Sequence, residues 1–327
     1  MGIEKYVYNS ILKNEIYDFL KLRAAQGRNR KTWYILLALD VFLTETCLSE
    51  KLLKPECIDG WVGKISHKMS ISTQLVYISH YTQFAKYLQS MGIGAFIPER
   101  PVRENKYVPY IFSREELDKM FETADKFSGA NVTGRSPNPI HFPMLIRILY
   151  GCGVRLGEAL SLTVADIDLD EGVIKVRNAK GNKDRLVPMD ESLTAIFRRY
   201  MSVFGKDLKE NSLIFESRKH TQYSEKWALH CFQNTLKHAG IALHILPRYS
   251  RNICVHCLRH TFAVNSFRKQ DIEGFDSYGS VPLLSVYMGH DDMMGTESYL
   301  HMTAENSNDI YEKMNRYTEG ILPEAPK

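Results

Sequence analysis

Several features that would assign the chain to a special class of protein are scarce or absent. Six cysteines spread through 327 residues do not form the framework of a small secreted domain, which predicts a reducing, cytoplasmic location. The longest apolar run, from Trp33 to Leu43, is interrupted by Asp40 and is too short to span a bilayer. The amino terminus lacks the layout of a secretion signal, and no internal repeat is present. A globular protein without a membrane segment is therefore expected.

The chain also has little net charge, formally +4, but this charge is unevenly distributed. Residues 1–112 hold 15 Lys or Arg against 10 Asp or Glu, whereas the remainder holds 27 against 28. A basic front portion fits a polyanionic partner. Many domains carry a charge of this size as a solvated face, so the charge alone does not identify the partner.

Apolar residues recur at helical spacing in the front portion and predict a bundle of four helices. The predicted helices cover about 8–20, 32–43, 58–65 and 72–91. Asp59 is a possible N-cap of the third helix, and Ser72 is expected to cap the fourth. A segment with three prolines then predicts an extended linker. The expected divisions are residues 1–95, a linker over 96–112, and a second domain over 113–327.

The second domain is predicted to begin with a capping box, Ser113-Arg-Glu-Glu116. Residues 141–150 form a helical pattern that Gly151-Cys-Gly153 interrupts. Val173–Val176 and Asp184–Pro188 alternate like the strands of a hairpin around a turn at 180–183. The polar segment 271–280 is expected to be a surface loop. The predicted fold class is mainly α with a small antiparallel β-hairpin or sheet: a helical bundle followed by a mixed α+β domain.

The run His256-Cys-Leu-Arg259-His260, followed by His290 and Tyr299, contains groups that phosphate chemistry can use. Arginine pairs with two phosphate oxygens at once, histidine can carry a proton at neutral pH, and tyrosine can form a covalent intermediate. Cys254 and Cys257 beside these histidines are an alternative zinc pattern. Because no second ligand pair has suitable spacing, no metal is expected.

Five motifs occur in a fixed order: Gly151-Cys-Gly-Val-Arg155-Leu-Gly-Glu158, Lys180-Gly-Asn-Lys183, His256-Cys-Leu-Arg259-His260, Gly289-His290, and Tyr299 nine residues after His290. In this order they resemble the tyrosine recombinases, also called the phage integrase family. The match covers residues 113 to about 302, and the helical front portion with its linker looks like the family's core-binding domain. The resemblance implies the simple two-domain type without an arm-binding domain. Residues 1–95 would bind core DNA, and residues 113–327 would form the catalytic domain.

The resemblance also implies roles for the motif residues. Tyr299 is expected to attack the scissile phosphorus and form a 3′-phosphotyrosine, and His256 to accept the tyrosine proton. Lys180 would protonate the leaving 5′-oxygen, with Lys183 as a rival for this role. Arg155 and Arg259 would bind the non-bridging phosphate oxygens, and His290 would donate a hydrogen bond to the phosphate. Glu158 would hold Arg155 in position. His260 and His301 are expected to be structural or to support a neighbouring site residue.

The implied activity is site-specific DNA recombination through a Holliday junction, without ATP, metal or any other cofactor. The implied partners are double-stranded DNA with short inverted core sites and three further copies of the chain. These copies would form a homotetramer through a tail helix at 306–317, which would dock on a neighbouring protomer. Alternatively, this helix packs on its own domain. A type IB topoisomerase and a catalytically silent DNA-binding accessory protein are alternative functions.

Overall fold

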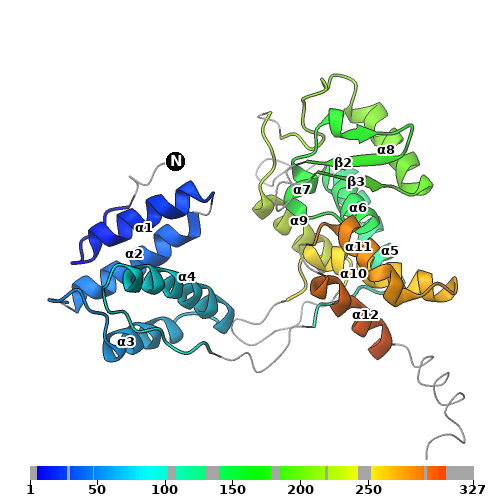
Figure 1. The fold of residues 1–327 in the computed structure, drawn as a ribbon. Coiled ribbons are helices and arrows are strands. Elements are labelled where there is room, and N and C mark those ends of the chain that lie inside the picture. The colour runs from blue at the N-terminus through cyan, green and yellow to red at the C-terminus, as the bar shows by residue number, and fades with distance from the viewer. Residues whose placement is uncertain are drawn as a thin grey trace, which may run out of the picture. The chain divides into compact units, whose positions relative to one another are not determined.

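Helices dominate both parts of the chain, as Figure 1 shows. The computed structural model describes residues 6–27, 30–46, 48–101, 108–129, 140–177, 184–217, 220–241, 252–290 and 293–306. Two units are distinguished by their internal contacts, one ending at Tyr107 and the other beginning at Val108. In the described parts of both units, no helix is long and apolar enough to cross a membrane.

The described part of the first unit contains four helices: α1 (Lys13–Ala25), α2 (Arg30–Glu45), α3 (Pro55–Ser66) and α4 (Ile71–Ser90). α4 packs against the other three, and Trp61, Tyr81 and Phe84 are fully buried in the shared core. Two predicted caps were wrong. α3 begins earlier, at Pro55, whose missing N–H suits the first helical position, and α4 is capped by Ser70, whose Oγ accepts from the backbone N–H of Thr73.

Asp40, the one charge in the apolar run of α2, is buried and satisfied. Its two carboxylate oxygens accept the backbone N–H groups of Asn9 and Ser10 at 2.8 and 2.9 Å. Such bonds offset the free-energy cost of burying a carboxylate. Asp40 therefore fixes the chain segment that leads into α1.

The second unit begins with α5 (Arg114–Gly129), and its predicted capping box is confirmed. The Glu116 N–H donates to the Ser113 Oγ, and the Ser113 N–H donates to the Glu116 carboxylate at 2.9 Å. The other helices among the described residues of this unit are α6 (Phe142–Cys152), α7 (Leu156–Leu160), the 3₁₀ turn η2 (Val164–Asp166), α8 (Glu191–Phe204), α9 (Glu225–His238), α10 (His256–Ile272), α11 (Ser277–Met288) and α12 (Met294–Asn306).

α6 lies at the centre of this unit and contacts α5, α7, α8 and α10. It continues through Gly151, contrary to prediction, and ends at Gly153, whose φ of 58° is left-handed. A Cβ on Gly153 would lie 2.3 Å from the ring of Phe262, so the position requires glycine for both reasons. The sharp stop lets the chain turn immediately into α7.

A three-stranded antiparallel sheet follows, in the order β1-β2-β3. β2 (Val173–Val176) and β3 (Arg185–Pro188) form the predicted hairpin, with Val173 opposite Pro188 and Val176 opposite Arg185. The short edge strand β1 (Ile167–Asp168) was not predicted, since two residues give no alternation to detect. The turn at 180–183 lies outside the described residues.

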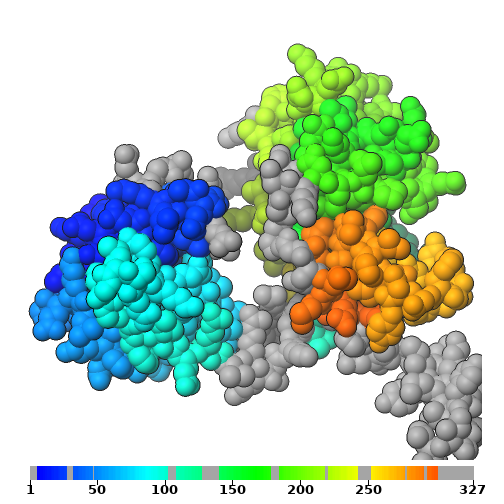
Figure 2. All heavy atoms as spheres, in the orientation of Figure 1, coloured from blue at the N-terminus to red at the C-terminus, as the bar shows by residue number. Residues whose placement is uncertain are grey.

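The expectation of a loop over 271–280 was wrong. α10 continues to Ile272, and Asp276 caps α11 by accepting the Tyr278 N–H at 3.0 Å, so only four residues separate the two helices. α11 lies at the surface of the unit, in orange in Figure 2, and exposes Leu283 and Val286. Its other face packs against α10 and α12. This packing brings the end of α11 and the middle of α12 close to the start of α10.

Candidate active site

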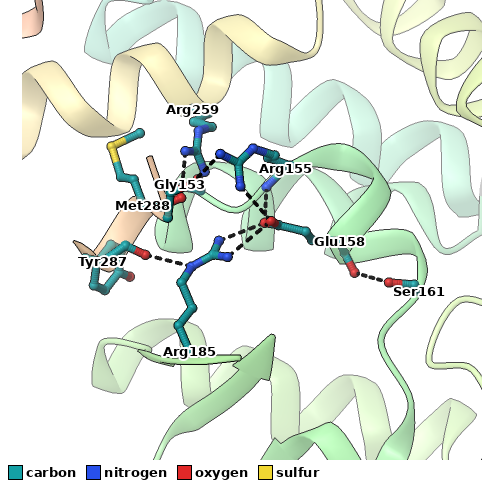
Figure 3. A network of polar contacts seen from close by, with 9 residues as sticks. Gly153, Arg155, Glu158, Ser161, Arg185, Arg259, Tyr287 and Met288 are labelled. Atoms are coloured by element: carbon teal, nitrogen blue, oxygen red, sulfur yellow. Dashed lines mark hydrogen bonds and ion pairs between the residues drawn. The ribbon is translucent and has the colours of Figure 1, made fainter. Parts of the chain in front are cut away.

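Arg155 and Glu158, which are neighbours on one helical turn, form a polar network with the more distant Arg185, as Figure 3 shows. Glu158 is one turn after Arg155, which occupies the N-cap position of α7, and Arg185 is the first residue of β3. The Glu158 carboxylate accepts the Arg155 backbone N–H and its Nη1 at 2.9 Å each. It also accepts both terminal nitrogens of Arg185, at 3.1 and 2.7 Å. Glu158 thus links the start of α7 to the sheet.

This pairing keeps Glu158 ionised although only 9% of its side chain is exposed. Burial alone would raise the pKa of Glu158, but hydrogen bonds from Arg185 and Arg155 outweigh burial and lower this pKa to about 2. Arg185 is equally buried and also donates through Nε to the Tyr287 carbonyl at 2.9 Å. Glu158 is therefore part of a largely buried three-residue network with Arg155 and Arg185, and not of an exposed ion pair on a helix surface.

The guanidinium groups of Arg155 and Arg259 are held by carbonyl groups at the ends of helices. Arg259, in the first turn of α10, donates to the Gly153 carbonyl and, at 2.7 Å, to the Met288 carbonyl. Arg155 Nη2 donates to the Gly289 carbonyl. These carbonyls lie at the carboxyl ends of α6 and α11, where the helix dipole is negative and favours cations. The contacts hold two like charges in one site.

Arg259 is 2% exposed, and its burial followed by the charge of Arg155 lowers its pKa to about 10. At neutral pH it therefore remains a cation. Together with Arg155, Glu158 and His256, it lines a cleft of about 1050 Å³. The cleft thus presents two guanidinium groups, a geometry that suits the oxygens of a phosphate group.

Tyr299 lies in the middle of α12 and is 4% exposed. Its hydroxyl is 2.8 Å from Nδ1 of His260, a hydrogen bond across 39 residues of sequence. Burial raises the pKa of Tyr299, while the charges of Arg259 and Arg155 act in the opposite direction. Burial has the larger effect, so the pKa of Tyr299 is raised overall and the resting side chain is a neutral phenol.

The three histidines of the motifs gather near this tyrosine. His256 and His260 lie four residues apart on one face of α10, with ring centroids 4.6 Å apart. His290, which follows α11, stacks near the Tyr299 ring at 6.2 Å, and its Nδ1 is 2.6 Å from the Thr296 hydroxyl. Among the described residues, no group of three or more His, Cys, Asp or Glu is placed to hold a metal ion.

The structure thus brings together Arg155, Glu158, His256, Arg259, His290 and Tyr299. Lys180 and Lys183 lie outside the described residues. Sequence reasoning missed Arg185, because nothing in a strand indicates which distant carboxylate it contacts. Sequence reasoning also gave His260 only a structural or supporting role. The four-residue spacing from His256 was a signal that both histidines share one helix face. His260, not His256, makes the hydrogen bond to Tyr299.

A mainly α fold with a small sheet and a clustered arginine–histidine–tyrosine site defines a narrow class of protein. Residues 111–306 match the phage integrase family, and the chain belongs to this family. The putative integrase/recombinase y4rB of Sinorhizobium fredii is 26% identical over 319 residues, which are 95% of this chain and 99% of that protein. The tyrosine recombinase XerC of Oceanobacillus iheyensis is 27% identical over 251 residues, or 74% of each protein.

Solved structures share the fold at lower identity. A lambda integrase fragment (residues 75–356), a dimer bound to a COC′ core site, has a TM-score of 0.64 and 13% identity, covering 88% of this chain and 94% of that chain. XerH recombinase bound to its difH substrate before cleavage has a TM-score of 0.60 and 20% identity, covering 85% and 78%. The predicted resemblance and fold class are confirmed.

Proposed function

We propose that the protein is a site-specific DNA recombinase that cleaves and rejoins DNA through Tyr299. The carrying observation is the placement of the buried Tyr299 beside a guanidinium pair that helix ends hold in place. In the proposed step, the Tyr299 oxygen bonds to the scissile phosphorus as the bond to the 5′-oxygen breaks. The 3′-phosphate stays on the tyrosine, and a 5′-hydroxyl is released. The retained ester allows rejoining without a nucleotide cofactor.

In this mechanism Arg155 and Arg259 bind the non-bridging oxygens, where negative charge grows in the transition state. Fixed donors in a site with little water can lower such a barrier by several kcal/mol, on the order of 3 for one donor. Glu158 and Arg185 position Arg155. His290 donates to the phosphate, and Lys180 supplies the proton to the leaving 5′-oxygen.

The proton acceptor for Tyr299 is assigned to His260 in place of His256, because the observed hydrogen bond joins His260 to the phenol. His256 lies beside the His260 ring and lines the cleft, where it would contact the phosphate of bound DNA. A His260→Ala variant should lower the cleavage rate and shift its pH dependence. If only His256→Ala did so, the assignment would be reversed.

Double-stranded DNA is the proposed partner, bound by the basic front unit over 1–95 and by the catalytic unit over 113–327. Lambda integrase (residues 75–356) was solved bound to DNA, and a lambda integrase tetramer was solved bound to a Holliday junction. By this analogy, four copies would act on two inverted core sites and exchange strands through such a junction. Type IB topoisomerase activity is the competing function, since it would use the same tyrosine chemistry without exchange.

A pool of nicked duplexes with randomised sequence, labelled on the strand segment 5′ to the cleavage position, tests the cleavage step. The nick releases a short fragment after cleavage and traps the covalent adduct. We expect the label to transfer to Tyr299 in the presence of a chelator and without nucleotide. Tyr299→Phe should abolish transfer, whereas Tyr278→Phe, which changes an exposed tyrosine of α11, should leave it unchanged. Adducts that persist in Tyr299→Phe would identify a different nucleophile.

The trapped sequences then separate the competing functions. Recombination of two plasmids that carry the selected site supports the recombinase, whereas relaxation of any supercoiled plasmid by single protomers supports the topoisomerase. A wild-type protein that binds DNA but forms no adduct would be an accessory protein.

A further inference from the structure

Two cysteines lie in contact at the start of α10, the helix that carries His256 and Arg259. The Cys257 N–H donates to the Cys254 carbonyl at 2.8 Å and closes a turn between them. This turn places the two sulfur atoms 3.9 Å apart, and the Cys254 N–H lies 3.4 Å from the Cys257 sulfur. The proposed reaction uses neither thiol.

We propose that Cys254 and Cys257 are a site of reversible oxidation, at which a disulfide forms and inactivates the neighbouring cleavage site. The effect on cleavage rests on the proposed function, whereas the formation of the disulfide does not. The oxidant class is a peroxide, and the reductant is a dithiol.

The position of the pair suits thiol oxidation. A disulfide has a sulfur–sulfur distance of about 2.05 Å, so the two atoms need to approach by roughly 1.9 Å. The positive end of the α10 dipole favours the thiolate form, which is the reactive one. Cys254 is partly exposed and lines the cleft, whereas Cys257 is fully buried. A peroxide dissolved in water therefore reaches Cys254 first.

The chemistry balances in two steps. The Cys254 thiolate attacks the peroxide, its sulfur becomes a sulfenic acid, and one water is released from hydrogen peroxide. The Cys257 thiol then attacks the Cys254 sulfur, the S–O bond breaks, and the hydroxyl leaves as a second water. Overall, two thiols lose two hydrogens to the peroxide. A dithiol reverses the reaction by exchange, becoming a disulfide itself.

Closing this bond changes the part of α10 that forms the site. His256 lies between the two cysteines, and Arg259 follows two residues later in the same turn. Cys257 packs among the buried residues of the unit, so the partly exposed Cys254 makes most of the approach and pulls on the backbone of His256, to which it is joined through one residue. The movement displaces His256 from His260 and disturbs the two carbonyl contacts of Arg259. Displacements of about 1 Å in an active site can lower a rate roughly a hundredfold.

The test compares reduced and peroxide-treated full-length protein in two measurements. Peptide mapping detects the Cys254–Cys257 disulfide as a loss of two hydrogens, and the nicked-duplex assay measures adduct formation. We expect the oxidised protein to carry the disulfide and to form adducts about a hundredfold more slowly, with recovery in dithiothreitol. Cys254→Ser and Cys257→Ala should cleave equally well before and after treatment.

Cys57→Ser is the matched control, because Cys57 is a partly exposed thiol of the other unit. It should keep the full sensitivity of the wild type. Absence of the disulfide, unchanged cleavage in protein that contains it, or equal inactivation of both cysteine variants would each overturn the proposal. If the reduced protein forms no adduct, the proposed function fails, and the mapped disulfide still decides whether this pair is an oxidation site.

Discussion

At the scale of single residues, the candidate site is a balance of charges around one carboxylate. Arg155, Arg185 and Arg259 supply three positive charges, and Glu158 supplies one negative charge. Two positive charges are left over. A phosphodiester carries one negative charge, and the transition state of its displacement by a phenolate carries two. The two remaining positive charges thus balance the two negative charges of the transition state, whereas the unreacted phosphodiester has only one. This difference favours binding of the transition state over binding of the substrate.

Arg185 is expected to be a positioning residue that acts through Glu158. Arg185→Ala removes the two hydrogen bonds that hold the carboxylate from the side of the sheet, so Glu158 and Arg155 lose their fixed geometry. The cleavage rate should fall about tenfold to a hundredfold, with little change in DNA affinity. The exposed Arg198, changed to Ala, is the control for the loss of an arginine on the same unit. A fall in DNA affinity with an unchanged cleavage rate would contradict this role.

The pKa of Glu158 predicts a pH-dependent contribution to stability. The pKa is about 2 in the folded state and near 4.5 as the usual value, so the stabilisation is fully present above 4.5 and is lost as the pH falls toward 2. Glu158→Gln should therefore be less stable than the wild type at pH 7, and this difference in unfolding free energy should shrink between pH 4.5 and 2. Urea unfolding at several pH values measures it. A difference that stays constant through this range would mean that the carboxylate charge is not the stabilising feature.

At the scale of elements, the site forms where helices end and begin. α6 and α11 each end at a left-handed glycine, and their last carbonyls accept hydrogen bonds from the arginines. The start of α10 and the middle of α12 supply the histidines and the tyrosine. Gly289 has a φ of 66°, and a Cβ there would lie 2.9 Å from the Arg185 guanidinium. The glycine of the Gly289-His290 motif is thus explained by backbone conformation and by a close neighbour.

Gly289→Ala should lower both stability and cleavage. The left-handed conformation alone costs a non-glycine residue roughly 1–2 kcal/mol, and displacement of Arg185 adds to this. Gly274→Ala separates the two effects, because Gly274 also has a positive φ, 78°, but nothing lies within 4 Å of an added Cβ. Thermal unfolding and the nicked-duplex assay should show a larger loss for Gly289→Ala in both. If both variants lost the same stability and cleaved at the wild-type rate, the close contact between position 289 and Arg185 would not matter for cleavage.

Elements that depend on nearby residues could be predicted from sequence, and contacts between distant ones could not. The capping box of Ser113 and Glu116 and the β2–β3 hairpin involve neighbours, so local patterns specify them. The end of α10 and the start of α11 were missed because polar and glycine residues suggested a loop, whereas Asp276 caps α11. The contact of Arg185 with Glu158 spans 27 residues, and that of His260 with Tyr299 spans 39. Only tertiary packing creates these contacts.

At the scale of the whole molecule, the sequence motifs are spread over almost 150 residues of the second unit, and the first unit contributes a basic bundle. The order of the motifs predicts Arg155, Arg259 and Tyr299 as site residues, and the structure places these three side chains in one region. Spacing alone could not have chosen one tyrosine among 18. α12 ends at Asn306, and the proposed assembly into a tetramer depends on the segment that follows this residue.

Deletion of residues 307–327 tests that assembly. The deletion retains α12, whose buried Tyr299 and Leu300 pack against the unit, so the site itself should remain intact. We expect the truncated protein to form the covalent adduct on nicked DNA as the wild type does, but not to form tetramers on paired sites or to complete strand exchange. Sedimentation of the DNA complexes and a two-plasmid recombination assay measure these outcomes. Exchange at the wild-type rate would show that the tail packs on its own unit, and loss of the adduct would place the tail in the cleavage step.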